Sequence, residues 1–204
     1  MTAPSNGGVR FANPMTMHPD FVSVFGLVLS TWGYYEGMLE MHIEFLSAVL
    51  TPVEREKPTR RGFTQRTKLF RDLAARAFHD APSIRNHINK LADRADSLGD
   101  ERNILCHGSW IPGGPKSPFI LFRRKNQSFI YTVEIDHLHQ IQKDIVSLYE
   151  RQFDLLTFAV YFDADSVTWI TSQEKSILQL FHKNNPPIPP SAKLPKPQHL
   201  PFRA

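Results

Sequence analysis

The sequence has a single cysteine, Cys106, among its 204 residues. One cysteine cannot form an intramolecular disulfide, and there is no C-x-x-C pair or Cys/His cluster of the kind that holds structural zinc. The uncharged segment at residues 21–35 is shorter than the roughly 20 apolar residues that a membrane span needs. These absences favour a soluble, cytoplasmic protein without a membrane segment, a metal or a cofactor.

Charge of either sign is also modest. Lys and Arg number 24 and Asp and Glu number 20, so the net charge is +4. This value is too small for a histone-like binder but is compatible with a local surface that faces phosphate groups. The chain length and its 41% hydrophobic content allow one well-buried core. We therefore expect one main domain at residues 20–183, after a flexible arm at 1–19 and before a disordered, proline-rich tail at 184–204.

Apolar residues recur at steps of three and four in most of the chain, which is the spacing of one helical face. This spacing predicts helices at residues 20–50, 64–78, 82–107, 136–162 and 171–183. Two short runs rich in β-branched and aromatic residues, at 119–124 and 128–134, predict a β-hairpin. The expected fold class is mainly α, an antiparallel helical bundle with a small hairpin insertion near residues 119–134.

Two charged residues occupy apolar faces of these predicted helices. Glu36 interrupts the face of the first helix, and Arg102 interrupts the face of the third helix. Burial of an unpaired guanidinium is unfavourable, so Arg102 needs either a carboxylate partner or an anionic ligand. The sequence predicts that Glu36 contacts Arg102.

The segment around Arg102 resembles a known motif. The letters "RNILCH", Arg102 to His107, are similar to the Arg, polar residue, three residues, His signature of the HEPN (higher eukaryote and prokaryote nucleotide-binding) superfamily. The order of the predicted helices, with the inward acid of "YYEGMLE", is also similar over residues 20–162. The resemblance implies a helical homodimer whose facing motifs form one cleft. Many members are metal-independent endoribonucleases, including toxins and defence proteins, so RNA and an antitoxin or regulatory protein are implied partners.

The resemblance also implies roles for individual residues. His107 would act on the ribose 2′-hydroxyl or the leaving oxygen, because an imidazole gains and loses a proton near neutral pH. Arg102 would hold the scissile phosphate, Asn103 would orient one of these groups, and Glu36 would support the site. Some family toxins carry a tyrosine two positions after the histidine, where an antitoxin adds AMP. This chain has Ser109 there, which argues against that route of neutralisation.

A basic segment lies between residues 55 and 76. It contains eight basic residues against Glu56 and Asp72, and such a segment could follow an RNA backbone. The predicted RNA-binding residues in it are Arg60, Arg61, Arg66, Lys68 and Arg71. A solvated surface is an equally open interpretation.

The same residues also permit an interpretation without catalysis. Arg102 and Glu36 could form a structural ion pair, with His107 interacting with the last carbonyls of its helix. The chain would then be a non-catalytic helical interaction or nucleotide-binding module. Cys106 is more typical of a small buried apolar group than of a nucleophile, because no base and orienting carboxylate are recognisable around it.

Overall fold

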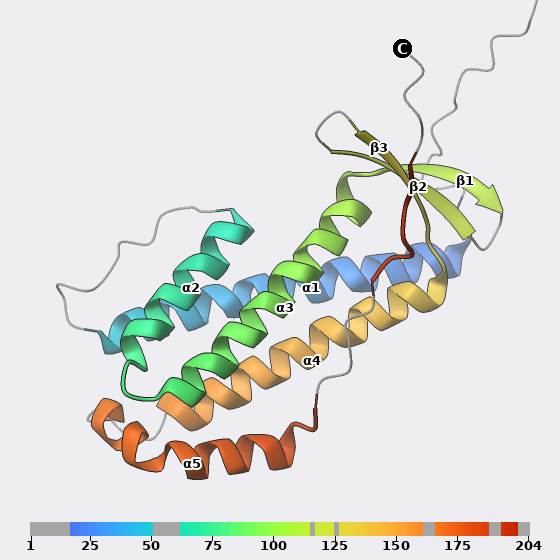
Figure 1. Ribbon diagram of the computed structural model, residues 1–204. Coiled ribbons are helices and arrows are strands. Elements are labelled where there is room, and N and C mark those ends of the chain that lie inside the picture. Colours follow the sequence, from blue (N-terminus) through green and yellow to red (C-terminus); the bar gives the residue numbers. More distant parts are fainter. Residues whose placement is uncertain are drawn as a thin grey trace, which may run out of the picture.

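The computed structural model describes residues 17–50, 62–114, 117–124, 127–160, 166–187 and 193–199. The helices in these residues are α1 (Pro19–Val49), α2 (Phe63–Ala77), α3 (Pro82–His107), α4 (Ile135–Val160) and α5 (Ser166–Asn184). The strands are β1 (Ser109–Gly114), β2 (Ser117–Arg124), β3 (Gln127–Thr132) and β4 (Gln198–His199). The predicted mainly helical fold is confirmed, and Figure 1 shows the small sheet at one end of the helices.

The helices do not all alternate in direction, contrary to the predicted antiparallel bundle. The rings of Trp32 and Phe63 lie 4.8 Å apart, and Arg66 forms an ion pair with Glu40 further along both helices, so α1 and α2 are parallel. Figure 1 shows that α4 also runs in the direction of α1, whereas α3 runs the opposite way. The prediction fails because α2 begins beside the middle of α1 and not beside its C-terminal end.

The predicted apolar faces form the core. Every apolar position of the α3 face and the corresponding positions of α4 are buried. They are Ile84, Ile88, Leu91, Ala95, Leu98 and Leu105 in α3 and Leu138, Ile141, Ile145, Leu148, Leu155 and Ala159 in α4. Burial of such faces is the main source of stability for helices of this kind. Helical periodicity therefore identified the buried faces of α3 and α4 correctly.

A polar group inside the core links α1 to α4. Gln152, which is fully buried, accepts a hydrogen bond from the Tyr35 hydroxyl through Oε1, at 3.1 Å. Its Nε2 lies 2.9 Å from Nδ1 of His42, which is only 4% exposed. Because an amide nitrogen can only donate, Nδ1 of His42 is the acceptor and the imidazole is neutral.

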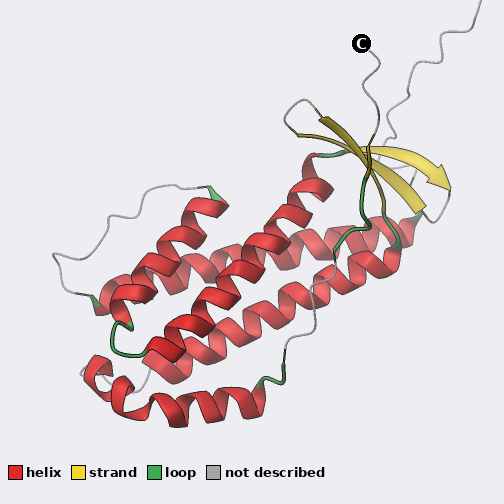
Figure 2. Ribbon diagram, viewed as in Figure 1, coloured by secondary structure: helices red, strands yellow, loops and turns green. Residues whose placement is uncertain are grey.

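The sheet is larger than the predicted hairpin. The β2–β3 hairpin is confirmed, with Phe122 directly opposite Phe129, but the full strand order is β1-β2-β3-β4 and every pairing is antiparallel. Strand β1 contains Pro112, Gly113 and Gly114, residue types that are uncommon in strands, and its register with β2 shifts after Ile111. Figure 2 shows the strands together past the C-terminal end of α3 and near the N-terminal ends of α1 and α4.

The predicted disorder of the tail is wrong for its described part, residues 185–187 and 193–199. Leu194 is buried, and its backbone N–H donates to Oε2 of the buried Glu101 in α3, at 3.1 Å. Gln198 and His199 then pair with β3. Proline excludes a helix but permits an extended edge strand, which explains why proline content was a poor guide here. The predicted N-terminal arm lies outside the described residues, apart from the three that precede Asp20.

Candidate functional site

The candidate site lies where α3 ends against the sheet. The helix stops at Gly108, whose N–H donates to the carbonyl of Ile104. A Cβ atom at Gly108 would lie 2.1 Å from Cγ2 of Ile120, so only glycine lets β2 approach this closely. The indole N–H of Trp110 donates to the carbonyl of Leu105, at 3.0 Å. These contacts fix the last turn of α3, which carries the "RNILCH" motif.

Arg102 is partly buried in this region. One of its terminal nitrogens, Nη1, donates to Oδ1 of the neighbouring Asn103 at 3.2 Å. Its Nε is buried and has no hydrogen-bond partner among the described residues. The structure therefore brings Arg102 and Asn103 together, and leaves the guanidinium without a carboxylate partner in the described part of the chain.

The predicted contact between Glu36 and Arg102 is wrong. The Glu36 carboxylate accepts a hydrogen bond from the indole of Trp32 at 2.6 Å and forms an ion pair with Arg66 at 3.0 Å. Arg66 belongs to α2, which packs against α1, so the counter-charge of Glu36 comes from α2 and not from α3. A charge on an apolar face shows that a partner is needed, but it does not show which helix supplies the partner.

His107 is exposed at the end of α3, one turn beyond Asn103. His107 lies five positions after Arg102, which corresponds to about 140° around a helix. One copy of the chain therefore presents the guanidinium and the imidazole on different sides of α3. Asn103 and His107, four residues apart, share a side of this helix.

Cys106 lies between these residues and is half-buried. Burial raises the pKa of its thiol, and the carboxylate of Glu36 acts in the same direction, whereas the charge of Arg102 opposes them. A raised pKa keeps the thiol protonated near neutral pH, which disfavours a nucleophilic role.

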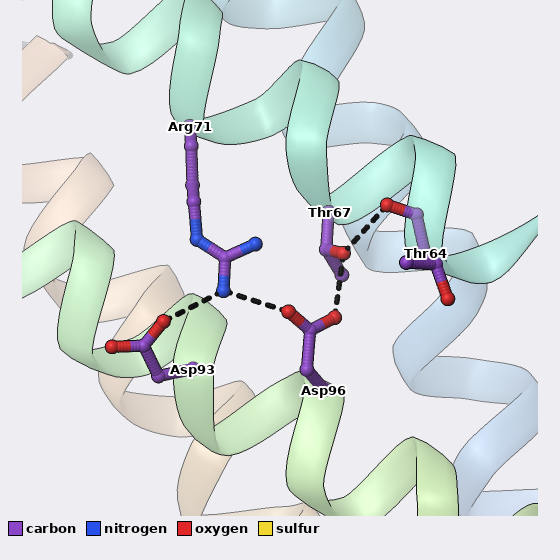
Figure 3. Close-up of polar contacts among 5 residues, drawn as sticks. All are labelled: Thr64, Thr67, Arg71, Asp93 and Asp96. Atoms are coloured by element: carbon purple, nitrogen blue, oxygen red, sulfur yellow. Dashed lines mark hydrogen bonds and ion pairs between the residues drawn. The ribbon is translucent and has the colours of Figure 1, made fainter.

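Two of the predicted RNA-binding residues are engaged within the protein. Arg66 pairs with Glu40 as well as with Glu36, and Arg71 bonds to Asp93 at 2.8 Å and to Asp96 at 2.7 Å. Figure 3 shows Asp96 between Arg71 and the buried hydroxyl of Thr67, so this cluster joins α2 to α3. Lys68 is exposed, and Arg60 and Arg61 lie outside the described residues. The basic segment thus contributes helix packing as well as surface charge.

A groove that the sequence did not predict lies between α3 and the β2–β3 hairpin. Its volume is about 270 Å³. We call it the α3 groove, and it is lined by Asp100, Asn103, Ile104, Phe122, Arg124, Phe129 and Tyr131. The alternation of aromatic residues in the two strands was the available signal, because it places Phe122, Phe129 and Tyr131 on one face of the hairpin. Arg102 and His107 do not line this groove, but Asn103 does.

Comparison of the chain with protein-family models, curated proteins and solved structures finds no match. Within the described ranges, no three His, Cys, Asp or Glu side chains gather in a way that could hold a metal ion. No described helix combines the length and the apolarity required to cross a membrane.

Proposed function

We propose that this protein binds RNA at the C-terminal end of α3 and is a HEPN-like, metal-independent endoribonuclease. The observation that carries the proposal is the state of Arg102, which is partly buried and has no carboxylate partner among the described residues. Burial of an unpaired guanidinium is unfavourable, and a phosphate group would compensate for it with paired hydrogen bonds. The exposed imidazole of His107 at the same end of the helix supplies a group that can transfer protons.

The proposed reaction is an internal transfer within the RNA. His107 removes the proton of a ribose 2′-hydroxyl, and the resulting oxygen attacks the adjacent phosphorus. The bond from phosphorus to the 5′-oxygen of the next nucleotide breaks, and that oxygen takes up a proton from water, to which the His107 imidazolium releases the proton it removed. The products are a 2′,3′-cyclic phosphate and a 5′-hydroxyl. Arg102 stabilises the negative charge that accumulates on the phosphoryl oxygens in the transition state.

The separation of Arg102 and His107 around α3 supports a homodimer as the active form. In the proposed dimer, the guanidinium of one copy and the imidazole of the second copy flank the same phosphate. Glu36 has no direct part in this site, because its carboxylate is engaged by Trp32 and Arg66. Its contribution is to the packing of α1 against α2.

RNA cleavage in excess chelator tests the proposal. Purified protein is incubated with varied single-stranded and structured RNAs, beside Arg102→Ala, His107→Ala and the control His139→Ala, which removes an exposed histidine of α4. We expect cleavage by the wild type and by the control, with a loss of about 100-fold or more in each site variant. Binding of RNA without cleavage would support the alternative, a non-catalytic interaction or nucleotide-binding module. Absence of both would reject the proposal.

Mixing two inactive variants tests the dimer. If Arg102 and His107 act across two copies, a mixture of Arg102→Ala and His107→Ala protein contains heterodimers with one intact site. About half of the protein molecules are then in heterodimers after random exchange, and cleavage returns in part. No recovery after proven exchange would place both residues in one copy or outside the site.

The biological setting that we propose is that of a toxin or defence protein held in check by an antitoxin or regulatory partner. Expression in a host cell would then arrest growth, and His107→Ala would relieve the arrest. Growth arrest that persists in this variant would contradict a role for RNA cleavage in toxicity.

A further inference from the structure

The two walls of the α3 groove differ in chemistry. Ile120 is fully buried, and Phe122, two positions later in β2, therefore projects from the same face of the hairpin, toward α3. Phe129 is its direct neighbour across the hairpin, and Tyr131 follows on the same face. This wall offers three aromatic rings and the side chain of Arg124, and the α3 wall offers Ile104 and the polar groups of Asp100 and Asn103. A mostly apolar recess with a few polar groups is typical of a site for a small planar ligand.

The hydrogen bond from Arg102 fixes the orientation of the Asn103 amide. A guanidinium can only donate, so the amide oxygen Oδ1 must face Arg102. The amide NH₂ group, which can only donate, is then left for a ligand in the α3 groove. Arg102 is in this respect a positioning residue for the groove.

Asp100 supplies the complementary group. It is exposed and lines the groove, and its carboxylate has no hydrogen bond or ion pair to another described side chain. An ionised carboxylate can only accept hydrogen bonds, and it can accept two at once. Asp100 and Asn103 are three residues apart on one side of α3, so their side chains are neighbours. Together they present an acceptor beside a donor.

We propose that the α3 groove binds one unpaired guanine base of the RNA, stacked on the hairpin aromatics. The Watson–Crick edge of guanine carries two adjacent donors, N1–H and the N2 amino group, beside the acceptor O6. The Asp100 carboxylate accepts from the two donors, and the Asn103 amide donates to O6. Adenine places an amino group where guanine has O6, and uracil places a carbonyl on each side of its single N–H, so both bases oppose this arrangement. Such reading of an unstacked base edge is typical of single-stranded RNA recognition.

The position of the groove connects this inference to the proposed RNA cleavage, on which it rests. His107 follows Asn103 by one turn on the same side of α3, toward the end of the helix. A base held by Asp100 and Asn103 would direct its own ribose and phosphate toward His107. Guanine binding would therefore select the linkage that is cleaved.

Fluorescence anisotropy with labelled single-stranded RNAs tests the base preference. The RNAs are short adenine tracts in which one central position is guanine, adenine, uracil, cytosine or inosine, the last of which lacks the 2-amino group. We expect the guanine-containing RNA to bind about tenfold more tightly than the all-adenine RNA, with inosine in between. Equal affinity for guanine and adenine would overturn the inference.

Variants identify the groups responsible. Asp100→Asn should reduce the preference for guanine. The new amide carries an NH₂ group, which would face the N1–H and N2 donors of guanine, where only an acceptor can form a hydrogen bond. Asn103→Asp replaces the donor toward O6 by an acceptor and should shift the preference toward adenine, whose amino group donates. Asp72→Asn, at an exposed position of α2, is the matched control and should leave the preference unchanged. A guanine preference that persists in Asp100→Asn would refute the assignment.

The stacking wall has a control within its own strand. Phe122→Leu removes a ring from the groove, whereas Phe119→Leu removes a ring from the opposite face of β2. We expect weaker binding of every RNA in the first variant by about tenfold, and unchanged binding in the second. Circular dichroism of each variant shows whether it is folded. Equal effects of the two changes in folded proteins would contradict stacking in the groove.

Calorimetric titration with guanosine monophosphate separates this inference from the proposed function. If the nucleotide binds and Asp100→Asn abolishes the binding, but no RNA binds, the groove assignment stands and the RNA proposal fails. If RNA binds without a base preference, the RNA proposal stands and the groove assignment fails. If neither the nucleotide nor any RNA binds, both are wrong.

Discussion

His42 makes the stability of this protein sensitive to mild acid. Burial lowers the pKa of His42 to about 4, from 6.5 for an exposed histidine. Protonation would place a hydrogen on Nδ1, where the NH₂ group of Gln152 already donates. The folded state therefore holds a neutral imidazole, whereas the unfolded chain binds a proton once the pH falls below about 6.5.

The direction and size of the effect follow from this difference. The His42 contribution to stability is fully present above the pKa of the unfolded chain, is lost as the pH falls from about 6.5 to about 4, and changes no further below that. Each pKa unit corresponds to about 1.4 kcal/mol, so the free energy of unfolding should fall by about 3 kcal/mol over this range through His42 alone. That is a large part of the 5–15 kcal/mol typical of a folded domain.

Urea denaturation followed by circular dichroism at several pH values measures this effect. His42→Gln is the reference, because glutamine does not titrate and can still accept a hydrogen bond from Gln152. The free energy of unfolding of the wild type, measured relative to that of the variant, should fall by about 3 kcal/mol between neutral pH and about pH 4. If the two proteins lose stability in parallel, His42 titrates normally in the fold and the reasoning is refuted.

Two further predictions concern the junction between α3 and the sheet. Gly108→Ala should destabilise the fold by about 1–3 kcal/mol, because the new methyl group would clash with Ile120. The control Gly33→Ala has open space around its Cβ position and should be neutral or stabilising by up to about 1 kcal/mol. Thermal unfolding of both variants measures the difference, and equal melting temperatures would contradict the close approach. Glu101→Leu removes the acceptor of the Leu194 N–H and should lower stability by about 1–3 kcal/mol. Glu101→Gln keeps an acceptor and should be at least as stable as wild type at neutral pH. The reason is that burial raises the pKa of Glu101, so its ionised form destabilises the fold as the pH rises. A Glu101→Gln variant that is as unstable as Glu101→Leu in urea would contradict this account.

Local sequence patterns predicted the helices well. The apolar spacing from Ile84 to Leu105, between Pro82 and Gly108, gave the bounds and the buried face of α3, since both depend on neighbouring residues. Periodicity also predicted the β2–β3 hairpin. Neither pattern predicts the relative direction of two helices, because this direction depends on the path of the segment that connects them.

The pairing of charges was less predictable. The sequence identified Glu36 and Arg102 correctly as charges that need an explanation, but Arg66 of α2 is the partner of Glu36. The same packing of α2 directs Arg71 to Asp93 and Asp96. Such ion pairs join different helices, and the packing of the whole core decides which helices are neighbours. The pattern of one helix therefore cannot show which of several basic residues pairs with a given carboxylate.

The α3 groove and strand β4 could not be read from local patterns. The groove joins residues of α3 to residues of the hairpin, and its shape depends on how closely Gly108 lets the two approach. Strand β4 lies in a proline-rich segment and gains its order from Leu194 and Glu101, which are far apart in sequence. Both features are products of tertiary packing.

The most direct measurement is a nuclear magnetic resonance titration of the His107 imidazole with short, guanine-containing single-stranded RNA. The exposed imidazole of His139 on α4 serves as the internal reference. RNA bound at the end of α3 should shift the His107 resonances and leave those of His139 in place, and Arg102→Ala should weaken the shift. Unchanged His107 resonances at RNA concentrations that saturate binding, or no binding at all, would contradict the assignment of an RNA site to the end of α3.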